Sequence, residues 1–556
     1  MSIFTEIKLW LSDKYNLTFL AVLLSALAIR IPYLFIESIW NDETFYLWYA
    51  DNSLSNPSYW FSKTMFTNSF YSVMIPIAIF KLIVGDIVLA GRLATLIFSI
   101  AGLILVYLMG IELKSRLTGL IAAILLSVQP MYWLIGSKVL LDVPLTTSFL
   151  LAAFCFIKWL QFKNKFWSIA LAVSMIIVIE TKLSGLLIAP VLGIYGILSL
   201  STLLLSKNHP LNKTRLLNLL KKKSTYIPFL ILLLLLILLL IPYFIGSQIY
   251  YNQFISSPTG PISTAISMAK DFAERGAPYS ESLFSLNKFF TSYINFFLAI
   301  GLIFMLVYRR KIDLIVISFA FYYIIYTVLT GGIVELRYGL PAIPFMILMV
   351  AFGLEESVHL VKTAVIKTED KLHTNKKLAF AIIIIALLLA YPFYGAAERM
   401  FAAKSSNYLG YQEAGAWIRE NVPSDAVIFA GSPGHIRLFS GYNFVNGTRN
   451  DEGKLDGNIY YGFKPDANLT GTPEMFVGFV KTLDKEIYLE VDIWEYSNQE
   501  WMYPLTKEKL TFLSKLGFKR VYTVFRDIST ENGVIKMSVI IILKRDKPAS
   551  AETSDK

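Results

Sequence analysis

The sequence predicts a polytopic α-helical membrane protein with a compact α/β domain at its C-terminal end. Three observations predict this architecture. Of the 556 residues, 55% are hydrophobic and only 16% are charged, whereas a soluble globular chain has roughly 25% charged residues. The mean hydropathy is +0.56. Long apolar runs end near residue 397, and a water-soluble pattern follows. This composition excludes a soluble enzyme, a disordered chain and a disulfide scaffold, and the lone Cys155 forms no intramolecular disulfide.

A helix needs ~20 apolar residues to cross a bilayer. The sequence contains about eleven runs of this kind, at 17–36, 91–112, 117–135, 141–160, 166–181, 183–205, 226–246, 288–308, 312–330, 338–356 and 378–397. The fifth run is short, and only a polar break separates the third from the fourth. The sequence therefore fits eleven spans or one more or fewer. The first run is too long for a cleavable signal peptide, and we expect it to be retained.

Basic residues predict the orientation, because cytoplasmic loops of membrane proteins are enriched in Lys and Arg. The net charge is +11, and these charges cluster in short loops, which argues for membrane orientation and against nucleic-acid binding. With the N-terminus inside, every inside loop is basic, including the segments 114–116, 207–223, 309–311 and 362–377. An odd number of spans places the segment after residue 397 outside. A plasma membrane is the expected location.

The segment from 398 to 556 reads as one soluble α/β domain. We expect helices at 411–420 and 507–516 and strands at 426–430, 486–491, 520–525 and 536–544. Asn446 and Asn468 begin glycosylation sequons. The stretch Ser432-Pro433-Gly434-His435 either contacts an acceptor molecule or forms structural turns, and we favour turns.

Charged residues at the ends of apolar runs carry the functional signal, because an unpaired charge there is costly. Four pairs of this kind occur, and the predicted topology puts all of them on the outside: Asp42 and Glu43, Lys138 and Asp142, Glu180 and Lys182, and Glu335 and Arg337. Their convergence on one face predicts a site at the outer membrane surface.

The adjacent carboxylates of Asp42 and Glu43 lie among aromatic residues directly after the first span. A carboxylate in a partly dry site has a raised proton affinity and can act as a general base. Neighbouring side chains on a loop point apart, so the two carboxylates need different roles. The alternative is a solvated loop end that helps to fix the topology.

Arg337 and Tyr338 come just before the tenth run. A guanidinium there offers planar donors that suit a phosphate. The alternative, a snorkelling anchor beside an aromatic belt, explains this pair equally well. Lys182 and Lys138 lie in similar positions. Several outside cations beside a carboxylate pair suit a lipid phosphate that approaches from the bilayer.

Several short motifs together resemble a known class of enzymes. They are Asp42-Glu43, Gly91-Arg92-Leu93, Leu141-Asp142-Val143-Pro144-Leu145, Thr181-Lys182-Leu183-Ser184-Gly185-Leu186 and Arg337-Tyr338-Gly339-Leu340-Pro341. Their order and common side resemble the multispanning glycosyltransferases of the GT-C class. The most similar branch contains the protein O-mannosyltransferases and aminoarabinose transferases, which use polyprenyl-phosphate sugars. The likeness covers the membrane half, to about residue 356.

The resemblance implies an inverting transfer of a mannose-like sugar to an acceptor hydroxyl on a protein, a glycan or an envelope lipid. It implies Asp42 as the catalytic base and Glu43 as a residue that orients the acceptor or its loop. Arg337, Lys182 and Lys138 would bind the donor phosphate, helped by Tyr338 and Glu335, and Asp142 would position a lysine or the sugar. The resemblance implies no metal or other cofactor, only the polyprenyl-phosphate sugar as substrate.

One departure from the class concerns the first outer loop. Its usual Pro-rich turn is absent from residues 63–71, although a surface helix from about 69 to 84 is expected, and Lys63 is one candidate for lining the donor channel there. The alternative functions are a lipid or sugar transporter or flippase, and a non-enzymatic assembly subunit. We disfavour the transporter because charges lie at span ends and no internal repeat is visible.

Overall fold

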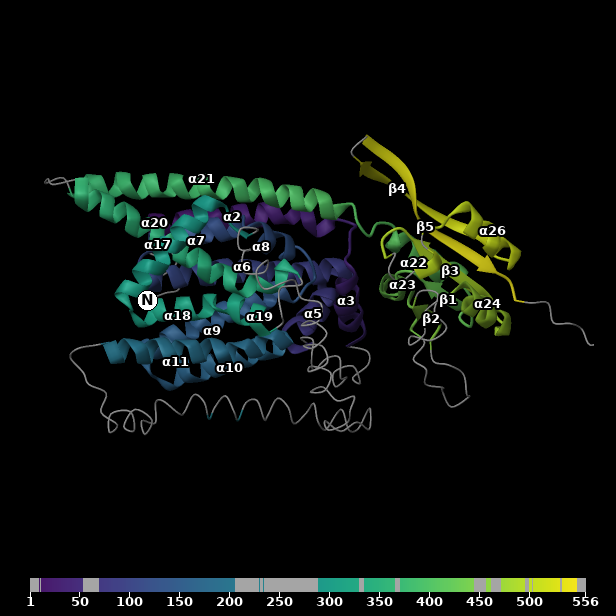
Figure 1. Ribbon diagram of the computed structural model, residues 1–556, viewed down its shortest axis with the longest axis horizontal. Helices are drawn as coiled ribbons and strands as arrows, with labels where there is room; N and C mark the ends of the chain where they lie inside the picture. Colours follow the sequence, from purple (N-terminus) through teal and green to yellow (C-terminus); the bar gives the residue numbers. More distant parts are fainter. Residues whose placement is uncertain are drawn as a thin grey trace, which may run out of the picture. The chain divides into compact units, whose positions relative to one another are not determined.

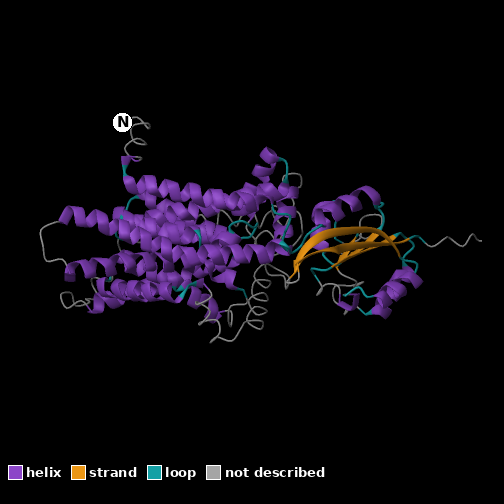
Figure 2. Cartoon of the chain, turned by 90° about the horizontal axis from the view of Figure 1, so that it is seen from above, coloured by secondary structure: helices purple, strands orange, loops and turns teal. Residues whose placement is uncertain are grey.

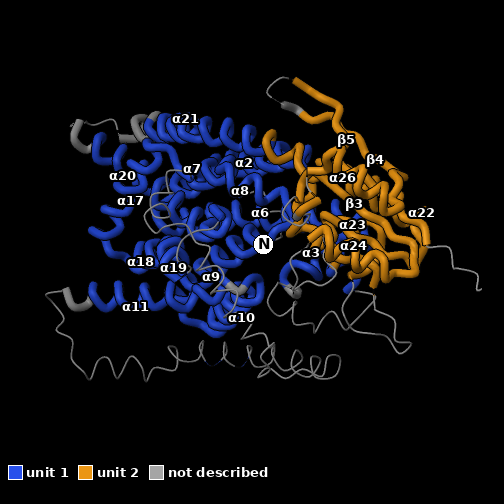
Figure 3. Tube along the Cα trace, turned by 45° about the vertical axis from the view of Figure 1, so that its right-hand side comes forward, with its two compact units in different colours: residues 1–35, 49–401 blue, residues 36–48, 402–556 orange. Residues whose placement is uncertain are grey.

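The computed structural model describes residues 10, 12–53, 70–205, 230, 234, 289–329, 335–365, 371–444, 457–461, 472–495, 500–502, 504–530 and 533–547. These residues form two compact units (Figure 3). Unit 1 comprises Met1–Phe35 and Tyr49–Phe401, and unit 2 comprises Ile36–Trp48 and Ala402–Lys556. The short segment 36–48 therefore belongs with the C-terminal part of the chain, although it follows the first helix.

Unit 1 is helical, and its long helices run side by side (Figure 1). Polar caps set where several of them begin. The Asp13 carboxylate accepts the N–H groups of Tyr15 and Asn16 at the start of α2, and Asp86 accepts that of Leu89 at the start of α6, which satisfies donors that a helix leaves unpaired. The elements up to residue 205 are α2 Lys14–Arg30, η1 Ile31–Phe35, α3 Asn41–Ser53, the π-turn η3 Phe70–Met74, α5 Ile75–Val84, α6 Ile87–Leu113, α7 Arg116–Ser127, α8 Pro130–Ile135, α9 Asp142–Phe162, α10 Lys165–Thr181, η4 Leu183–Leu187 and α11 Ile188–Leu205.

The second half of unit 1 contains fewer described elements. They are α17 Ser292–Tyr308, α18 Lys311–Ala320, α19 Tyr322–Leu329, η5 Leu336–Ala342, α20 Ile343–Val365 and α21 Lys371–Ser405, the last of which continues into unit 2. Helices α17 and α20 approach closely at Gly301, where a Cβ atom would collide with the carbonyl of Met349. A glycine is therefore needed for this crossing.

Seven of the described helical segments are long and apolar enough to cross a membrane: Lys14–Phe35, Ile87–Leu113, Asp142–Phe162, Ser184–Thr202, Lys311–Leu329, Leu336–Lys362 and Leu378–Ser405. The chain is thus a multi-pass membrane protein, as predicted. The expected run at 117–135 is divided into α7 and α8. The run at 226–246 lies outside the described residues, and so does Lys63. The expected surface helix of the first outer loop corresponds to η3 and α5.

Unit 2 contains a five-stranded sheet with helices on both faces (Figure 2). Its strand order is β2-β1-β3-β5-β4, where β1 pairs parallel with β2 and β3, and β5 pairs antiparallel with β3 and β4. The strands are β1 Val427–Ala430, β2 Ile459–Tyr461, β3 Ile487–Asp492, β4 Lys519–Thr530 and β5 Gly533–Arg545. The helices are α22 Tyr411–Asn421, α23 Pro433–Ser440, α24 Pro473–Thr482, η6 Glu500–Met502 and α26 Lys507–Lys515.

The six elements that the sequence predicted in this domain are confirmed within a few residues: α22, α26, β1, β3, β4 and β5. The turns favoured for 432–435 are wrong, because helix α23 begins at Pro433 and buries Ser432 and His435. Pro at the first helical position is pre-organised for a helix, and this preference outweighs the turn-forming residues around it. The sequons at Asn446 and Asn468 lie outside the described residues.

Candidate active site

An ion pair between α9 and the end of α10 forms the centre of the candidate site in unit 1. Lys182 follows the last residue of α10 in an extended conformation. Its Nζ atom lies 2.7 Å from Oδ1 of Asp142, the first residue of α9, whose side chain is only 3% exposed. A carboxylate this deeply buried needs a cation, so each residue fixes the other in place.

Tyr338 lies beside two cations. The Nζ atom of Lys182 is 4.4 Å from the centroid of its ring, and the Arg337 guanidinium is 5.3 Å from the same centroid. The Nε atom of Arg337 is 2.5 Å from Oε2 of Glu335. The attraction between cations and the face of an aromatic ring contributes to holding both charges here. Five of the residues predicted from the sequence therefore come together in unit 1.

Two tyrosines that sequence reasoning missed extend this cluster. The rings of Tyr326 and Tyr338 are 6.0 Å apart, and those of Tyr322 and Tyr326 are also 6.0 Å apart. Both additional tyrosines are on α19, where the four-residue spacing places them on one face. That spacing is the available signal, but buried aromatic residues at helical spacing also occur in ordinary cores.

The residues before Lys182 connect the cluster to the first outer loop. The Ser72 N–H in η3 donates to Glu180 Oε2 at 3.0 Å, and Thr181 Oγ1 donates to Ser72 Oγ at 3.1 Å. The end of α10 and the start of the surface helix are thereby joined. Glu180, one of the charged residues identified from the sequence, thus contacts η3, the start of the surface helix.

Lys138 lies in the turn between α8 and α9, four residues before Asp142, and is only 4% exposed. Helix α8 and helix α9 both pack against η5, the element that carries Arg337 and Tyr338. Lys138 is thus buried next to the elements that carry Asp142, Arg337 and Tyr338.

Two buried arginines fix the end of the first span. Arg92 Nη1 donates to the carbonyl of Leu34 at 2.9 Å, and Arg30 Nη2 donates to that of Ser127 at 2.8 Å. Carbonyls at a helix end lack partners within the helix, and these guanidinium groups supply donors. Both hydrogen bonds involve residues 30–34, which directly precede the segment that carries Asp42.

In unit 2, Asp42 and Glu43 lie in the first turn of α3 and have opposite surroundings. Asp42 is exposed, whereas Glu43 is fully buried. Glu43 Oε1 accepts the N–H of Trp40 at 2.8 Å. This side chain reaches back to the residue before the helix, as the glutamate of a capping box does. The pair is helical and not a loop, and Glu43 organises the turn that presents Asp42.

The charge of Asp42 acts on two side chains of the C-terminal domain. Tyr408 donates its hydroxyl to Glu495 Oε1 at 2.7 Å. Burial raises the pKa of Glu495, and the charges of Asp492 and Asp42 raise it further. The same effects, with Glu495 included, raise the pKa of Tyr408. Asp42 therefore shares a polar environment with Glu495 inside unit 2.

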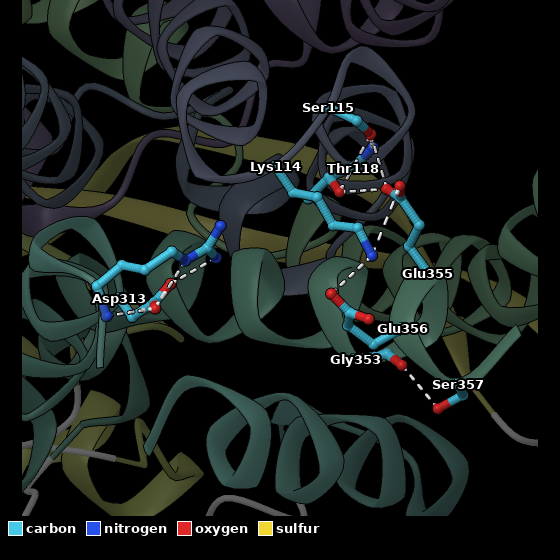
Figure 4. Close-up of polar contacts among 9 residues, drawn as sticks. Lys114, Ser115, Thr118, Asp313, Gly353, Glu355, Glu356 and Ser357 are labelled. Atoms are coloured by element: carbon cyan, nitrogen blue, oxygen red, sulfur yellow. Dashed lines mark hydrogen bonds and ion pairs between the residues drawn. The ribbon is translucent and has the colours of Figure 1, made fainter. Parts of the chain in front are cut away.

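A second polar cluster lies near the C-terminal ends of α6 and α20 (Figure 4). Lys114 Nζ is 2.8 Å from Glu356 Oε1, and Ser115 Oγ donates to Glu355 Oε2 at 2.7 Å. A cavity of about 430 Å³ adjoins it, lined among others by Arg116, Glu355, His359 and Lys362. Basic residues in this cluster were predicted to face the cytoplasm, and the ion pairs show how acidic groups hold them.

The arrangement is suited to binding an anion in unit 1. The lysine has three N–H donors and the arginine five, and donors of this kind bind carboxylates and phosphates. In the part of the chain that the structure describes, no group of three His, Cys, Asp or Glu side chains is placed to hold a metal ion.

Comparison with protein families gives a match over residues 83–255, to the family described as dolichyl-phosphate-mannose-protein mannosyltransferase. The matched stretch includes Lys138, Asp142 and Lys182. No curated protein matches the sequence.

Comparison with solved structures gives similar folds for nearly the whole chain. ArnT from Cupriavidus metallidurans, bound to undecaprenyl phosphate, is similar with a TM-score of 0.57 and 11% identity, covering 95% of this chain and 97% of that one. The oligosaccharyltransferase of Archaeoglobus fulgidus, tethered to an acceptor peptide, is similar with a TM-score of 0.50 and 16% identity, covering 95% and 74%. These likenesses show that the chain has the GT-C fold of these two proteins, and the family match covers residues 83–255, about a third of the chain.

Proposed function

We propose that the protein transfers a mannose-like sugar from a polyprenyl or dolichyl phosphate to an acceptor hydroxyl on the extracytoplasmic face. The observation that carries this proposal is the pair of cations beside Tyr338, with Lys182 held by Asp142 and Arg337 by Glu335. These cations would bind the donor phosphate. Lys138, buried four residues before Asp142, would add a third positive charge to the donor site.

Asp42 would act as the general base. Its carboxylate takes the proton of the acceptor hydroxyl while the oxygen attacks the anomeric carbon from the side opposite the phosphate. The bond from the anomeric carbon to the phosphate oxygen breaks, the configuration inverts, and the polyprenyl phosphate leaves with one more negative charge. Lys182 and Arg337 would stabilise this growing charge, and stabilisation of this kind accelerates the chemical step. Glu43 would keep the turn of Asp42 in shape.

Two comparisons support a polyprenyl-phosphate sugar as the donor. The matched family uses dolichyl-phosphate mannose by its description, and the similar ArnT structure holds undecaprenyl phosphate. The family description names a protein as acceptor, so a protein hydroxyl is the first acceptor to test, before a glycan or an envelope lipid. The basic segments at 114–116, 309–311 and 362–377 support a cytoplasmic N-terminus and an extracytoplasmic C-terminal domain in the plasma membrane.

The test is label transfer by the purified protein. Polyprenyl-phosphate mannose labelled in the sugar is supplied with an envelope extract, and the wild type is compared with Asp42→Asn. Asp425→Asn is the matched control, since Asp425 is another exposed aspartate of unit 2. We expect label in a protein fraction with the wild type and the control only.

Transfer by a folded Asp42→Asn protein at the wild-type rate would refute the mechanism. Passage of the donor across proteoliposomes without a new glycosidic bond would favour a transporter instead. Glucose and pentose donors, tested in parallel, distinguish a wrong sugar from a wrong function.

A further inference from the structure

The segment that carries Asp42 is bound to the C-terminal domain at one particular place on its sheet. His435 Nε2 is 2.8 Å from the carbonyl oxygen of Ile39. His435 lies in the first turn of α23, which follows the carboxyl end of β1. Strands β1 and β3 are parallel neighbours. After β1 the chain enters α23, which packs in one core of the domain, and after β3 it continues to α26, which packs in the other. In open α/β sheets ligands bind beside helices that start at such a position, and here the protein's own Ile39 contacts the first turn of α23.

Glu37 forms the second attachment. Its Oε1 atom accepts the N–H of Gly410 at 2.7 Å and an N–H of Arg526 Nη2 at 2.8 Å, and its Oε2 atom accepts that of Arg526 Nε at 3.0 Å. Two parallel bonds between a guanidinium and a carboxylate fix both orientation and distance. Arg526 also donates to Glu413 Oε2 at 2.8 Å, which orients its guanidinium from the opposite side.

The surroundings of His435 require that its Nε2–H group donates to the carbonyl oxygen of Ile39. It is fully buried, and the rings of Tyr411 and Tyr408 stack on it at 4.1 and 5.3 Å. Burial lowers the pKa of His435 to about 4, so the imidazole is neutral at pH 7. A carbonyl oxygen only accepts, and therefore the proton lies on Nε2.

Close packing at Gly434 completes the attachment. A Cβ atom on Gly434 would lie 2.5 Å from Thr44 Oγ1 and 3.0 Å from Asn41 Oδ1. The first turns of α23 and α3 therefore approach as closely as the backbone allows. The Arg437 guanidinium also lies 3.1 Å from the centroid of the Trp48 ring. Asp42 is thus bracketed on both sides by attached residues, from Glu37 and Ile39 to Thr44 and Trp48.

We propose that the C-terminal domain positions the catalytic base, with Arg526 and His435 as positioning residues that act through Glu37 and Ile39. The proposal rests on the proposed function, since it needs Asp42 to be the base. A displacement of a reacting group by about 1 Å can lower a rate ~100-fold, so loosening residues 37–44 lowers kcat. The donor phosphate contacts of Lys182 and Arg337 belong to unit 1, so the KM for the donor stays near its wild-type value.

The test compares Glu37→Gln, Arg526→Gln and the double variant in the full-length protein. Two readouts are measured: kcat and KM for the labelled donor, and hydrogen exchange of the peptide 37–48. Glu486→Gln is the matched control, because the Glu486–Lys544 pair has a similar length, 2.9 against 2.8 Å, and similar exposure on the same sheet. Glu413→Gln controls for the other partner of Arg526. Exchange in 487–492 reports whether the sheet remains folded.

We expect kcat to fall about 10- to 100-fold in each single variant and to fall no further in the double variant, because both changes break one interaction. Exchange of 37–48 rises in these variants and not in Glu486→Gln. Unchanged exchange would overturn the attachment, and raised exchange with unchanged kcat would overturn the positioning role. If the wild type transfers no sugar from any donor, the proposed function fails, and the positioning role with it, whereas the exchange data still decide whether the segment is attached.

Discussion

Lys182 and Asp142 are 40 positions apart in the chain, and their side chains form an ion pair 2.7 Å long at the ends of two neighbouring helices. The pair holds the lysine beside Tyr338, in a position that an isolated lysine at a helix end would not keep. Its geometry gives the first prediction.

Replacing Lys182 with Met lowers kcat more than it raises KM for the donor, because a phosphate gains charge in the transition state. We expect a loss of about 10²–10³ in kcat, the range found when one stabilising donor is removed. Lys182→Arg retains the charge and is the control. If Lys182→Met and Lys182→Arg changed kcat and KM to the same extent, Lys182 would have only a structural role. Steady-state kinetics with labelled donor provide the measurement.

Asp42→Asn lowers kcat by about 10²–10⁴, the contribution typical of a general base. Because Asp42 is exposed and Asn is also accepted in a first helical turn, we expect the fold to be unaffected. Glu43→Ala is less severe in kcat but loosens the turn, since it removes the Oε1 atom that accepts the Trp40 N–H. Transfer rates combined with hydrogen exchange of 37–48 separate the two effects.

The C-terminal domain loses stability in acid through His435. Its pKa is lowered from 6.5 to about 4 by burial, so the unfolded state takes up a proton that the folded state does not. Stability is complete above pH 6.5 and falls as the pH decreases to 4, by about 3 kcal/mol at 1.36 kcal/mol per pKa unit. Hydrogen exchange in 427–440 measures this loss in the full-length protein. His435→Asn should lack this part of the pH dependence, and an identical pH profile in the variant would contradict the prediction.

Glu490 produces the opposite dependence. Burial and the charge of Asp492 raise its pKa well above 4.5, so its contribution to stability is complete below pH 4.5 and is lost as the pH rises toward the folded-state pKa. Glu490→Gln removes the ionisable group, and the variant should lose less stability than the wild type between pH 5 and pH 9. Thermal unfolding of the full-length protein at both pH values gives the comparison, with the exposed Glu474→Gln as control.

Gly434→Ala tests the close approach of α23 and α3. Its Cβ atom would meet Thr44 Oγ1 at 2.5 Å, and overpacking of this kind costs about 1–3 kcal/mol. We expect lower kcat and faster exchange of 37–48, with partial recovery in Gly434→Ala/Thr44→Ala, which removes the hydroxyl. Without recovery, the cause would lie elsewhere than in this contact.

The sequence predicts the residues of the charged cluster around Lys182 but not their contacts. Charges at the ends of apolar runs must be compensated, and this rule was enough to identify Asp142, Lys182, Glu335 and Arg337 as one group. It could not indicate Tyr326, because an aromatic residue on a helix face is equally consistent with an ordinary core. Nor could it say that Tyr338 lies beside both cations, which depends on how η5 packs.

The attachment of the Asp42 segment had no signal in the sequence at all. Glu37 and Arg526 are 489 positions apart, and each alone reads as an ordinary surface charge. Ser432 reads as a turn residue, yet its hydroxyl donates to Asp492 Oδ2 at 2.8 Å inside the domain. Both contacts depend on the tertiary fold of unit 2, which local preferences do not determine.

The same separation has a consequence for biosynthesis. A ribosome that adds about 5–20 residues per second needs roughly 25–100 seconds to travel from Glu37 to Arg526. Throughout that time the helices of unit 1 can insert into the membrane, while Glu37 lacks its Arg526 partner and can bind only the N–H of Gly410. The nascent protein would therefore complete the attachment of the Asp42 segment only once β4 has been made, so that incomplete chains would hold this segment less firmly.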